Sequence, residues 1–481
     1  MVSDRLKQIV ERVRGKLTSK PTPKEQLEKN LKIFNGQLSR LRKYGSGQIA
    51  AIMAQRAATF AAYRHTGLFT SVELENFISD ISREKVHSAT KQSPVGQGAT
   101  LHILSRALEA GGHTRVVERW ISASPRSEVH SLLITRGGKP TAKLKAAISD
   151  HKGDVVIQQR FSSLLKRARQ IQTVSRNYSR VVLHVHMDDI LPLLAFSEDN
   201  ESPEIVHFNH ADHRFWVGST LPNRVIEMRT WGKRLSESHR AIHNSEVVGI
   251  PLPELGEKRN IDKNQAREVL GISKNDQVLL TVGHSRKYFA ENQLHLAEAV
   301  RNLLLGFPNR RLIVVGPGPK LDSNWKKLAS DFPDQVKILP YIPKEKLDLF
   351  MRASDLGLDS FPMSGGTAVL DMLSNELPFI SLKCATGHFD VIHESPFYCQ
   401  TLEEWINKAN LTLKQNSITV QVAMNHILRE AENRYGSNVW ARLLTGGQKN
   451  LPTGLESEAV NIEELNEYLV SSTPKLAKLF F

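Results

Sequence analysis

A strand, a glycine-containing turn and a helix follow one another between residues 355 and 373, and this stretch constrains the fold most strongly. Asp355–Asp359 is a short apolar run that predicts a buried strand. The turn Ser364–Thr367 follows, and the apolar residues from Thr367 to Leu373 predict a helix. Free N–H groups and the helix dipole favour an anion such as phosphate at a helix N-terminus. The sequence therefore predicts a phosphate site, with two glycines that allow close approach to the main chain.

An acidic side chain stands one helical turn beyond this turn. Asp371 lies four residues after Thr367. A carboxylate in this place can accept hydrogen bonds from ribose hydroxyls, as acidic residues do in nucleotide sites. The alternative is a plain strand–turn–helix connection with a solvated Asp371, and the local pattern leaves both interpretations open.

Length and patterning together predict the domain organisation. A chain of 481 residues is too long for one ordinary core. Strands alternate with helices from about residue 86, and the pattern resumes at Gln277 after the proline-containing linker Val247–Glu254. We therefore expect an α/β protein with two Rossmann-like domains facing each other across a cleft. The expected parts are a basic helical extension at 1–85, a first domain at 86–250, a second domain at 251–445 and a tail helix within 446–481.

The start of the first domain is expected to be a turn, a helix and a strand. Gly96 and Gly98 lie in a turn that would open a helix over Leu101–Ala110 and would let a ligand approach the backbone. Thr114–Ile121, rich in β-branched residues, predicts the strand that follows. A lone Gly-x-Gly is weak evidence, so a purely structural turn remains the plainer interpretation.

The charge distribution bears on partners. The net charge is +14, and residues 1–70 hold fourteen Lys and Arg against four Asp and Glu. This excess predicts a membrane surface or an acidic protein as partner of the N-terminal helices, or simply a solvated basic face, which the interspersed polar residues favour. The rest of the chain is only mildly basic, which argues against a nucleic-acid partner.

Other features of composition indicate the compartment. The chain has two cysteines, Cys384 and Cys399, and no apolar run long enough to span a membrane. We therefore expect a cytoplasmic protein, either free or peripheral to the inner face of the membrane.

A basic loop follows the first strand of the second domain. Arg286 and Lys287 come directly after Gln277–Gly283. Loops after the carboxyl ends of parallel strands gather on one edge of the sheet, so this loop and the turn Ser364–Thr367 are expected to face the same ligand. Arg286 and Lys287 could then neutralise a diphosphate, although a surface Arg-Lys pair is the plainer interpretation.

Histidines and aspartates cluster at two adjacent strand ends of the first domain. One cluster is His184–Asp189, and the other runs from His207 to His213. Such clusters indicate either a metal site or a general base oriented by an aspartate, and the absence of a Cys or His-Glu-x-x-His pattern weakens the zinc alternative. We expect His210 or His213 to be the base and Asp212 to orient it, although a single histidine is more often a core residue.

The chain resembles a known enzyme class at this point. Phe361-Pro-Met-Ser-Gly-Gly-Thr-Ala-Val-Leu-Asp371 is similar to the donor loop of the O-GlcNAc transferase and HMW1C-type N-glucosyltransferase family, and Lys287 occupies the place of the family's phosphate-contacting lysine. The general layout resembles bacterial family-4 sugar transferases. These resemblances imply a GT-B glycosyltransferase, of hexosyl or N-acetylhexosaminyl type, with no cofactor beyond a nucleotide diphosphate sugar, expected to be UDP-linked. The implied donor site comprises Gly96, Gly98, Arg286, Lys287, Ser364, Gly365, Gly366, Thr367 and Asp371.

Departures from these families limit what the resemblance implies. Retaining family-4 enzymes usually carry two glutamates eight positions apart here, whereas this chain has Met363 and Asp371. We therefore expect an inverting reaction without a metal. No tetratricopeptide period is present, so the acceptor could be a protein, a glycan or a lipid-linked sugar. The alternatives are a sugar-nucleotide epimerase on the same fold and a non-catalytic partner subunit.

Overall fold

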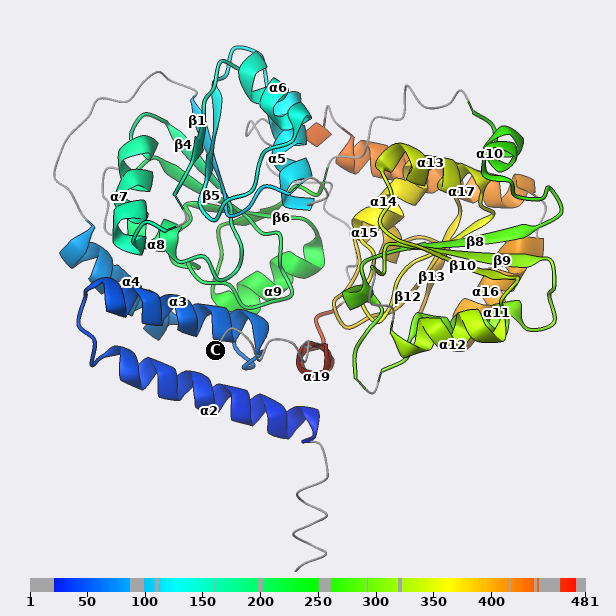
Figure 1. Cartoon of the computed structure of the whole chain (residues 1–481), viewed down its shortest axis with the longest axis horizontal. Helices are drawn as coiled ribbons and strands as arrows, with labels where there is room; N and C mark the ends of the chain where they lie inside the picture. Colours follow the sequence, from blue (N-terminus) through cyan, green and yellow to red (C-terminus); the bar gives the residue numbers. More distant parts are fainter. Residues whose placement is uncertain are drawn as a thin grey trace, which may run out of the picture.

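Two parallel β-sheets, each flanked by helices, form the body of the computed structural model (Figure 1). The structure describes residues 21–86, 99–108, 112–159, 161–197, 202–250, 261–291, 293–318, 322–414, 417–436, 439–440 and 459–472. Residues 1–20 of the expected helical extension lie outside these residues, as do Gly96 and Gly98.

The first sheet has seven parallel strands. Its spatial order is β3 (Val155–Ile157), β2 (His130–Ile134), β1 (Thr100–Leu104), β4 (Arg180–His184), β5 (Glu204–Phe208), β6 (Arg224–Glu227) and β7 (Ser245–Val247). The helices of this domain are α5 (Gly112–Ala123), α6 (Ala142–Asp150), α7 (Leu164–Ser175), α8 (Leu191–Phe196) and α9 (Thr230–Arg240). The strand order reverses between β1 and β4, which is where α/β sheets bind ligands.

The second sheet repeats this plan with six strands. Its order is β10 (Val336–Leu339), β9 (Arg310–Val315), β8 (Gln277–Val282), β11 (Leu356–Leu358), β12 (Phe379–Leu382) and β13 (Tyr398–Cys399). Its helices are α10 (Lys263–Leu270), the 3₁₀ turn η1 (Ser285–Lys287), α11 (Leu296–Leu304), α12 (Ser323–Asp331), α13 (Lys344–Ala353), α14 (Thr367–Ser374), α15 (Asp390–His393), α16 (Leu402–Lys414) and α17 (Ser417–Tyr435). The order reverses between β8 and β11, so η1 and the turn before α14 meet at a second switch point. The expected fold of two Rossmann-like domains is confirmed.

Both sequence assignments between residues 101 and 121 are wrong. Thr100–Leu104 is the central strand β1, all five of whose residues are buried, and Gly112–Ala123 is the helix α5. A short apolar run buried on both faces of a parallel strand has no period that separates it from a helix. In α5, residues 116, 117, 120 and 121 recur at helical spacing on the buried face, and this period overrides the strand preference of the β-branched residues.

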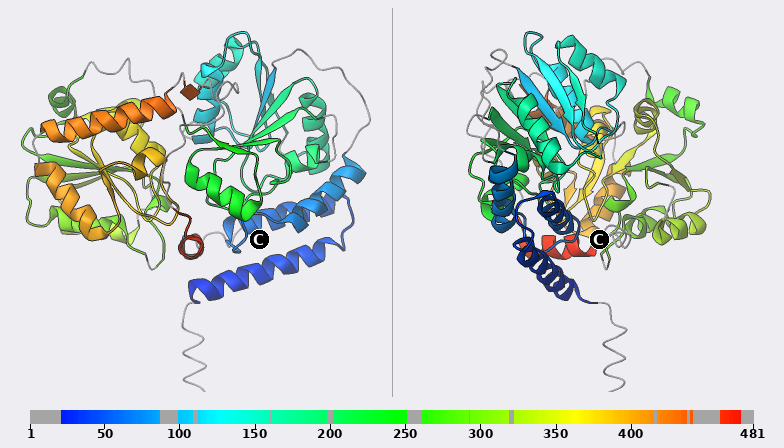
Figure 2. Two further views of the ribbon diagram at one scale, coloured as in Figure 1. Left: turned by 180° about the vertical axis from the view of Figure 1, so that it is seen from behind. Right: turned by 60° about the vertical axis from the view of Figure 1, so that its left-hand side comes forward.

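The described N-terminal helices are part of the first domain. They are α2 (Pro23–Leu41), α3 (Gln48–Tyr63) and α4 (Val72–Lys85), and they line one side of that domain (Figure 2). Glu75 of α4 is buried and accepts hydrogen bonds from the amides of Gly218, Ser219 and Thr220 at 2.9, 2.9 and 3.0 Å. A buried carboxylate with three amide donors fixes α4 to the body of the domain. No helix among the described residues is long and apolar enough to cross a membrane.

The tail helix α19 (Ile462–Ser471) lies where α2 and both domains meet (Figure 1). Its Leu465, Tyr468 and Leu469 pack in one apolar cluster with Trp231 of α9 and Ala290 of the second domain. The amide of Glu291 also donates to the carbonyl of Ser471 at 3.1 Å. The chain therefore returns from the second domain to tie the two domains together.

A glycine contact at this domain boundary gives a test of the packing. Gly387 has φ +63°, and a Cβ there would lie 2.6 Å from the ring of Trp231. Gly387→Ala therefore combines a left-handed backbone with overpacking, and we expect a loss of about 2–4 kcal/mol in the free energy of unfolding, measured by denaturant titration. Gly271 has φ +64° with open space around it, so Gly271→Ala is the matched control and costs about 1 kcal/mol. Equal losses in the two variants would contradict the packing shown.

Candidate active site

Lys287 joins the basic loop to the glycine turn. It ends η1, directly after β8, and its Nζ donates to the carbonyl oxygens of Ser364 at 3.0 Å and Gly365 at 2.7 Å. The two segments predicted to face one ligand therefore touch. Burial lowers the pKa of Lys287 to about 8, an effect that the negative charge of Asp359 opposes. The Nζ is held by neutral carbonyl oxygens, so it can turn to an anion without breaking an ion pair.

The interior of the glycine turn is organised by a carboxylate that the sequence analysis missed. Asp359 follows β11 and is buried; its two oxygens accept from Ser364 Oγ at 2.8 Å and from the Gly365 amide at 2.6 Å. The Gly366 amide donates in turn to Ser364 Oγ at 3.2 Å. These three hydrogen bonds hold the turn in shape. The binding of a phosphate by Ser364, Gly365 and Gly366 stays a prediction. The Thr367 amide, at the first residue of α14, has no acceptor among the described residues.

Asp371 faces the first domain from α14. A small cavity there is lined by α5 and α14, and its residues are Gly112, Arg115, Val116, Arg119, Ile250, Thr367, Leu370 and Asp371. Lys344 Nζ lies 3.4 Å from Asp371 Oδ1. Burial lowers the pKa of Arg119, and the charge of Asp371 opposes this shift. Arg115 and Arg119 were not predicted, because α5 was assigned to a strand and their spacing of four was not recognised as one helix face.

Arg286 is exposed beside Lys287. Burial raises the pKa of Tyr63 in α3, and the positive charge of Arg286 opposes this shift. Burial lowers the pKa of Arg214 in the first domain, and the charge of Arg286 adds to this shift. The structure therefore places Arg286 at the domain boundary, without a hydrogen bond or ion pair to the glycine turn among the described residues.

The three predicted catalytic residues fall into two separate arrangements. Asp212 binds Arg229 through two contacts, at 2.6 and 2.8 Å, and lies 3.2 Å from His213 Nδ1. The Arg229 guanidinium keeps the pKa of Asp212 below its usual range despite burial, and burial lowers the pKa of His213 to about 4. His210 instead contacts His184 Nδ1 through Nε2 at 3.0 Å and stacks on His113 at 3.9 Å between ring centroids. Asp212 thus orients His213 and not His210.

Arg229 and Thr230 connect this arrangement to the second domain. Arg229 Nη1 donates to the carbonyl of Gly387 at 2.7 Å, while the amide and hydroxyl of Thr230 donate to Asp390 Oδ2 at 3.2 and 3.0 Å. Gly387 lies in the loop after β12. The carboxyl edges of both sheets are therefore held face to face by polar contacts.

The histidine-rich ends of β4 and β5 do not converge on a single point. Among the described residues, no group of three or more His, Cys, Asp or Glu is arranged to hold a metal ion. His207, for example, stacks on Trp216 at 4.3 Å between ring centroids, whereas His184 and His210 contact each other.

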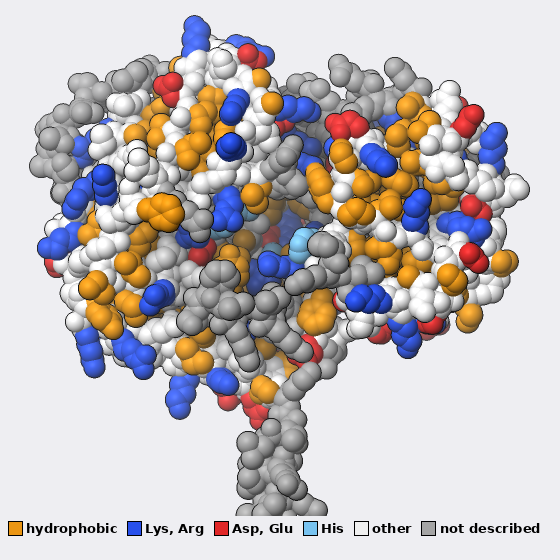
Figure 3. Space-filling model, in the orientation of Figure 1, with side chains coloured by type: hydrophobic (Ala, Val, Ile, Leu, Met, Phe, Trp, Pro, Cys, Tyr) orange, Lys and Arg blue, Asp and Glu red, His pale blue; other side chains and the backbone are white. Residues whose placement is uncertain are grey.

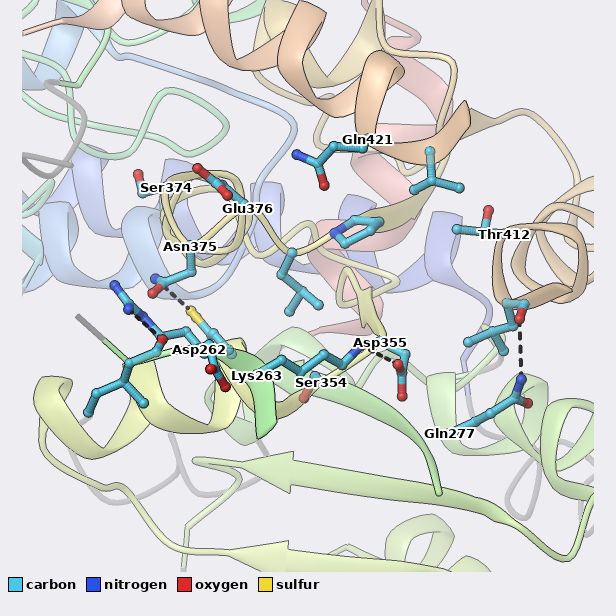
Figure 4. Close-up of a pocket in the computed structure, with 17 residues that line it drawn as sticks. Asp262, Lys263, Gln277, Ser354, Asp355, Ser374, Asn375, Glu376, Thr412 and Gln421 are labelled. Atoms are coloured by element: carbon cyan, nitrogen blue, oxygen red, sulfur yellow. Dashed lines mark hydrogen bonds and ion pairs between the residues drawn. The ribbon is translucent and has the colours of Figure 1, made fainter. Parts of the chain in front are cut away.

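A cavity of about 620 Å³ lies at the opposite edge of the second sheet (Figure 4). Its lining includes Gln277 and Asp355, which stand at the amino ends of β8 and β11, and Asn375 after α14. Ligands of open α/β sheets bind outside the carboxyl ends of the strands. This cavity is therefore separate from the site around Lys287.

In the space-filling view, Lys and Arg side chains gather in the hollow between the two domains (Figure 3).

Comparison with known proteins agrees with this geometry. Residues 262–405 match the family model described as glycosyl transferases group 1. No curated protein matches the sequence.

Solved structures share the two-domain architecture. Anabaena HepE, solved with UDP and glucose, has a TM-score of 0.55 at 16% identity over 72% of this chain and 98% of its own. Sucrose-phosphate synthase from Thermosynechococcus elongatus has a TM-score of 0.53 at 13% identity over 73% of this chain and 98% of its own. An O-GlcNAc transferase mutant from Thermobaculum terrenum has a TM-score of 0.48 at 13% identity over 88% and 86%. At these identities, the first two show the fold. The chain accordingly has the GT-B fold, and residues 262–405 within it match the model of the group 1 glycosyl transferases.

Proposed function

We propose that this chain transfers a hexose or N-acetylhexosamine from a UDP-linked sugar to an acceptor held by the first domain. One observation supports it above the others: Lys287, the start of α14 and Asp371 lie together at the switch point of the second sheet. A cation, a free helix N-terminus and a carboxylate are the groups that bind a diphosphate and a ribose. HepE binds UDP on the same fold, which supports UDP as the nucleotide.

The chemistry assigned to the donor side is electrostatic. Lys287 would turn from the Ser364 and Gly365 carbonyls to the diphosphate and stabilise the charge that develops as the diphosphate leaves. The Thr367 amide would bind a phosphate oxygen, and Asp371 would accept from the ribose. We propose that these groups and the arginines of α5 make a metal ion unnecessary.

On the acceptor side, His210 is our first candidate for the base. Burial keeps the pKa of His210 well below its usual value, so the imidazole is neutral at pH 7 and has a nitrogen able to accept a proton. His213 is the second candidate, but its Nδ1 faces Asp212 and its Nε2 is buried. The base would remove the acceptor proton while the acceptor attacks C1 from the face opposite the diphosphate, which inverts the anomeric centre. The acceptor is a protein side chain, a glycan or a lipid-linked sugar.

A nucleotide screen tests the proposal directly. We expect calorimetry to show binding of UDP in preference to GDP, ADP and CMP, with the same affinity in EDTA as in Mg²⁺. UDP release from UDP-glucose and UDP-N-acetylglucosamine then measures turnover. Rearrangement of the donor without an acceptor would identify an epimerase, and absence of both binding and turnover would identify a non-catalytic partner.

The role of Asp371 predicts a loss of nucleotide affinity. Asp371→Asn keeps the shape but removes the charged acceptor, so UDP should bind roughly tenfold to 150-fold more weakly, which corresponds to about 1.5–3 kcal/mol for a charged hydrogen bond. UDP affinity and thermal stability are measured together. Asp334→Asn, at an exposed position before β10, is the matched control and should leave both unchanged. An unaltered affinity in Asp371→Asn would refute this placement of the ribose.

Lys287 predicts a dependence of UDP affinity on pH. Its pKa of about 8 means that the ammonium form dominates below pH 8 and must be regained on binding above it. UDP affinity should therefore fall above pH 8, by at most about tenfold per pH unit, whereas uridine affinity should not. In Lys287→Met the affinity should be low throughout and this slope absent, while Lys337→Met, an exposed change on β10, should behave as the unaltered protein. A slope that persists in Lys287→Met would assign it to another group.

A further inference from the structure

Four histidines form a continuous hydrogen-bonded row across the first sheet, and we call His130, His102, His184 and His210 the histidine row. His130 Nδ1 lies 3.0 Å from His102 Nε2, His102 Nδ1 lies 3.2 Å from His184 Nε2, and His184 Nδ1 lies 3.0 Å from His210 Nε2. The row begins on β2, crosses β1 and β4, and ends just after β5. It therefore joins one side of the sheet to the predicted base.

The strand register creates this row. His130 pairs with Thr100 and His184 pairs with Leu104, so His102 lies two residues from each partner on the same sheet face. Each ring thus sits one diagonal step nearer the carboxyl edge than the ring before it. His210 continues the diagonal beyond the end of β5.

The surroundings keep the four rings neutral. His102 and His184 are fully buried, and Trp120 packs edge-on against both. Burial lowers the pKa of His102 and His184 well below the usual value and that of His130 to about 3. The positive charge of Arg180 adds to this effect at His102 and His130. Each ring therefore carries a single N–H.

Neutral rings allow only two arrangements that satisfy all three contacts. Either every ring is protonated at Nε2 and donates toward His130, or every ring is protonated at Nδ1 and donates toward His210. His130 Nε2 is buried without a hydrogen-bond partner among the described residues, and Glu128 Oε2 lies 3.4 Å away. A carboxylate favours a proton on the nitrogen that faces it, so Glu128 selects the first arrangement. That arrangement leaves Nδ1 of His210 as a free lone pair.

We propose that the histidine row is a proton relay that carries the acceptor's proton from His210 to Glu128 during sugar transfer. This inference rests on the proposed function, with His210 as the base. His210 would be the catalytic residue, and His184, His102 and His130 would act through it.

The transfer balances at every ring. The acceptor gives its proton to His210 Nδ1 while the acceptor atom bonds to the sugar C1. The bond between C1 and the diphosphate oxygen breaks, and its electron pair leaves with the diphosphate. Nε2 of each ring passes its proton to Nδ1 of the next, and His130 Nε2 passes the last one to the Glu128 carboxylate. No ring retains two protons, so no imidazolium has to form in the core. After the products leave, the reverse transfers return a proton from Glu128 along the row to His210 Nε2, and His210 Nδ1 releases its proton to water in the cleft.

Glu128 offers a test that does not disturb the core, because its side chain is 28% exposed. The probe reaction is single-turnover hydrolysis of UDP-glucose and UDP-N-acetylglucosamine by the full-length chain, with water as the acceptor. In Glu128→Gln we expect this rate to fall roughly tenfold to a hundredfold, with UDP affinity unchanged. This is less than most of the range of about 10²–10⁴ that general-base catalysis contributes, because His210 itself is still present. Glu237→Gln on α9, also partly exposed, is the control and should keep the full rate. An undiminished rate in Glu128→Gln would overturn the relay.

The tautomers give a second measurement that needs no turnover. Nitrogen-15 NMR of ring-labelled histidine, assigned with single His→Gln variants, should show Nε2–H and a bare Nδ1 at His210. In Glu128→Lys an ammonium would face His130 Nε2, which should move the proton of every ring in the row to Nδ1. A protonated Nδ1 at His210 in the unaltered chain, or a His210 tautomer that ignores Glu128→Lys, would refute the coupling. Expected tautomers without any donor hydrolysis would instead refute the proposed function.

Discussion

The buried carboxylate of Asp359 is the interaction on which the donor side depends. It accepts from Ser364 Oγ and the Gly365 amide, and from Ser381 Oγ on β12 at 3.1 Å. A buried charge is tolerated only where its acceptor capacity is used, and these donors use it. Burial lowers the pKa of Lys287, and the negative charge of Asp359 opposes this shift. One side chain therefore influences both the shape of the turn and the charge of the cation beside it.

The two carboxyl edges meet beside a buried ion pair. Asp212 holds Arg229 on the first domain, and Arg229 reaches the Gly387 carbonyl on the second. The contact lies in the loop after β12, close to the turn that Asp359 shapes. Opening the domains would expose the guanidinium to water but leave its ion pair with Asp212 intact, so this particular contact adds little to the cost of separating the domains.

The sequence predicted the second domain more fully than the first, for physical reasons. Strand, turn and helix around Gly365 have strong local signals, and the meeting of Lys287 with that turn follows from the edge rule for parallel sheets. The helix α5 was missed because its β-branched residues favour a strand locally, and with it Arg119 was lost. Asp359 also bonds Ser381, which is 22 positions away, and Arg229 bonds residues 17 and 158 positions away, separations that no local pattern covers. The contact between Asp212 and His213 follows from their adjacency in the sequence, whereas the contact of His210 with His184 depends on how the two strand ends lie in the sheet.

In the proposed mechanism, the histidine row gives the buried base His210 a neighbour that takes up a proton. Burial keeps His210 neutral and available, but the same burial penalises the imidazolium that proton uptake would create. A base in this position is efficient only if the positive charge does not stay. Four rings on one diagonal of the sheet meet this requirement, since each passes on a proton as it receives one. The diagonal exists because β1, β2 and β4 are parallel and in register, so the sheet that carries the fold also determines where the proton can go.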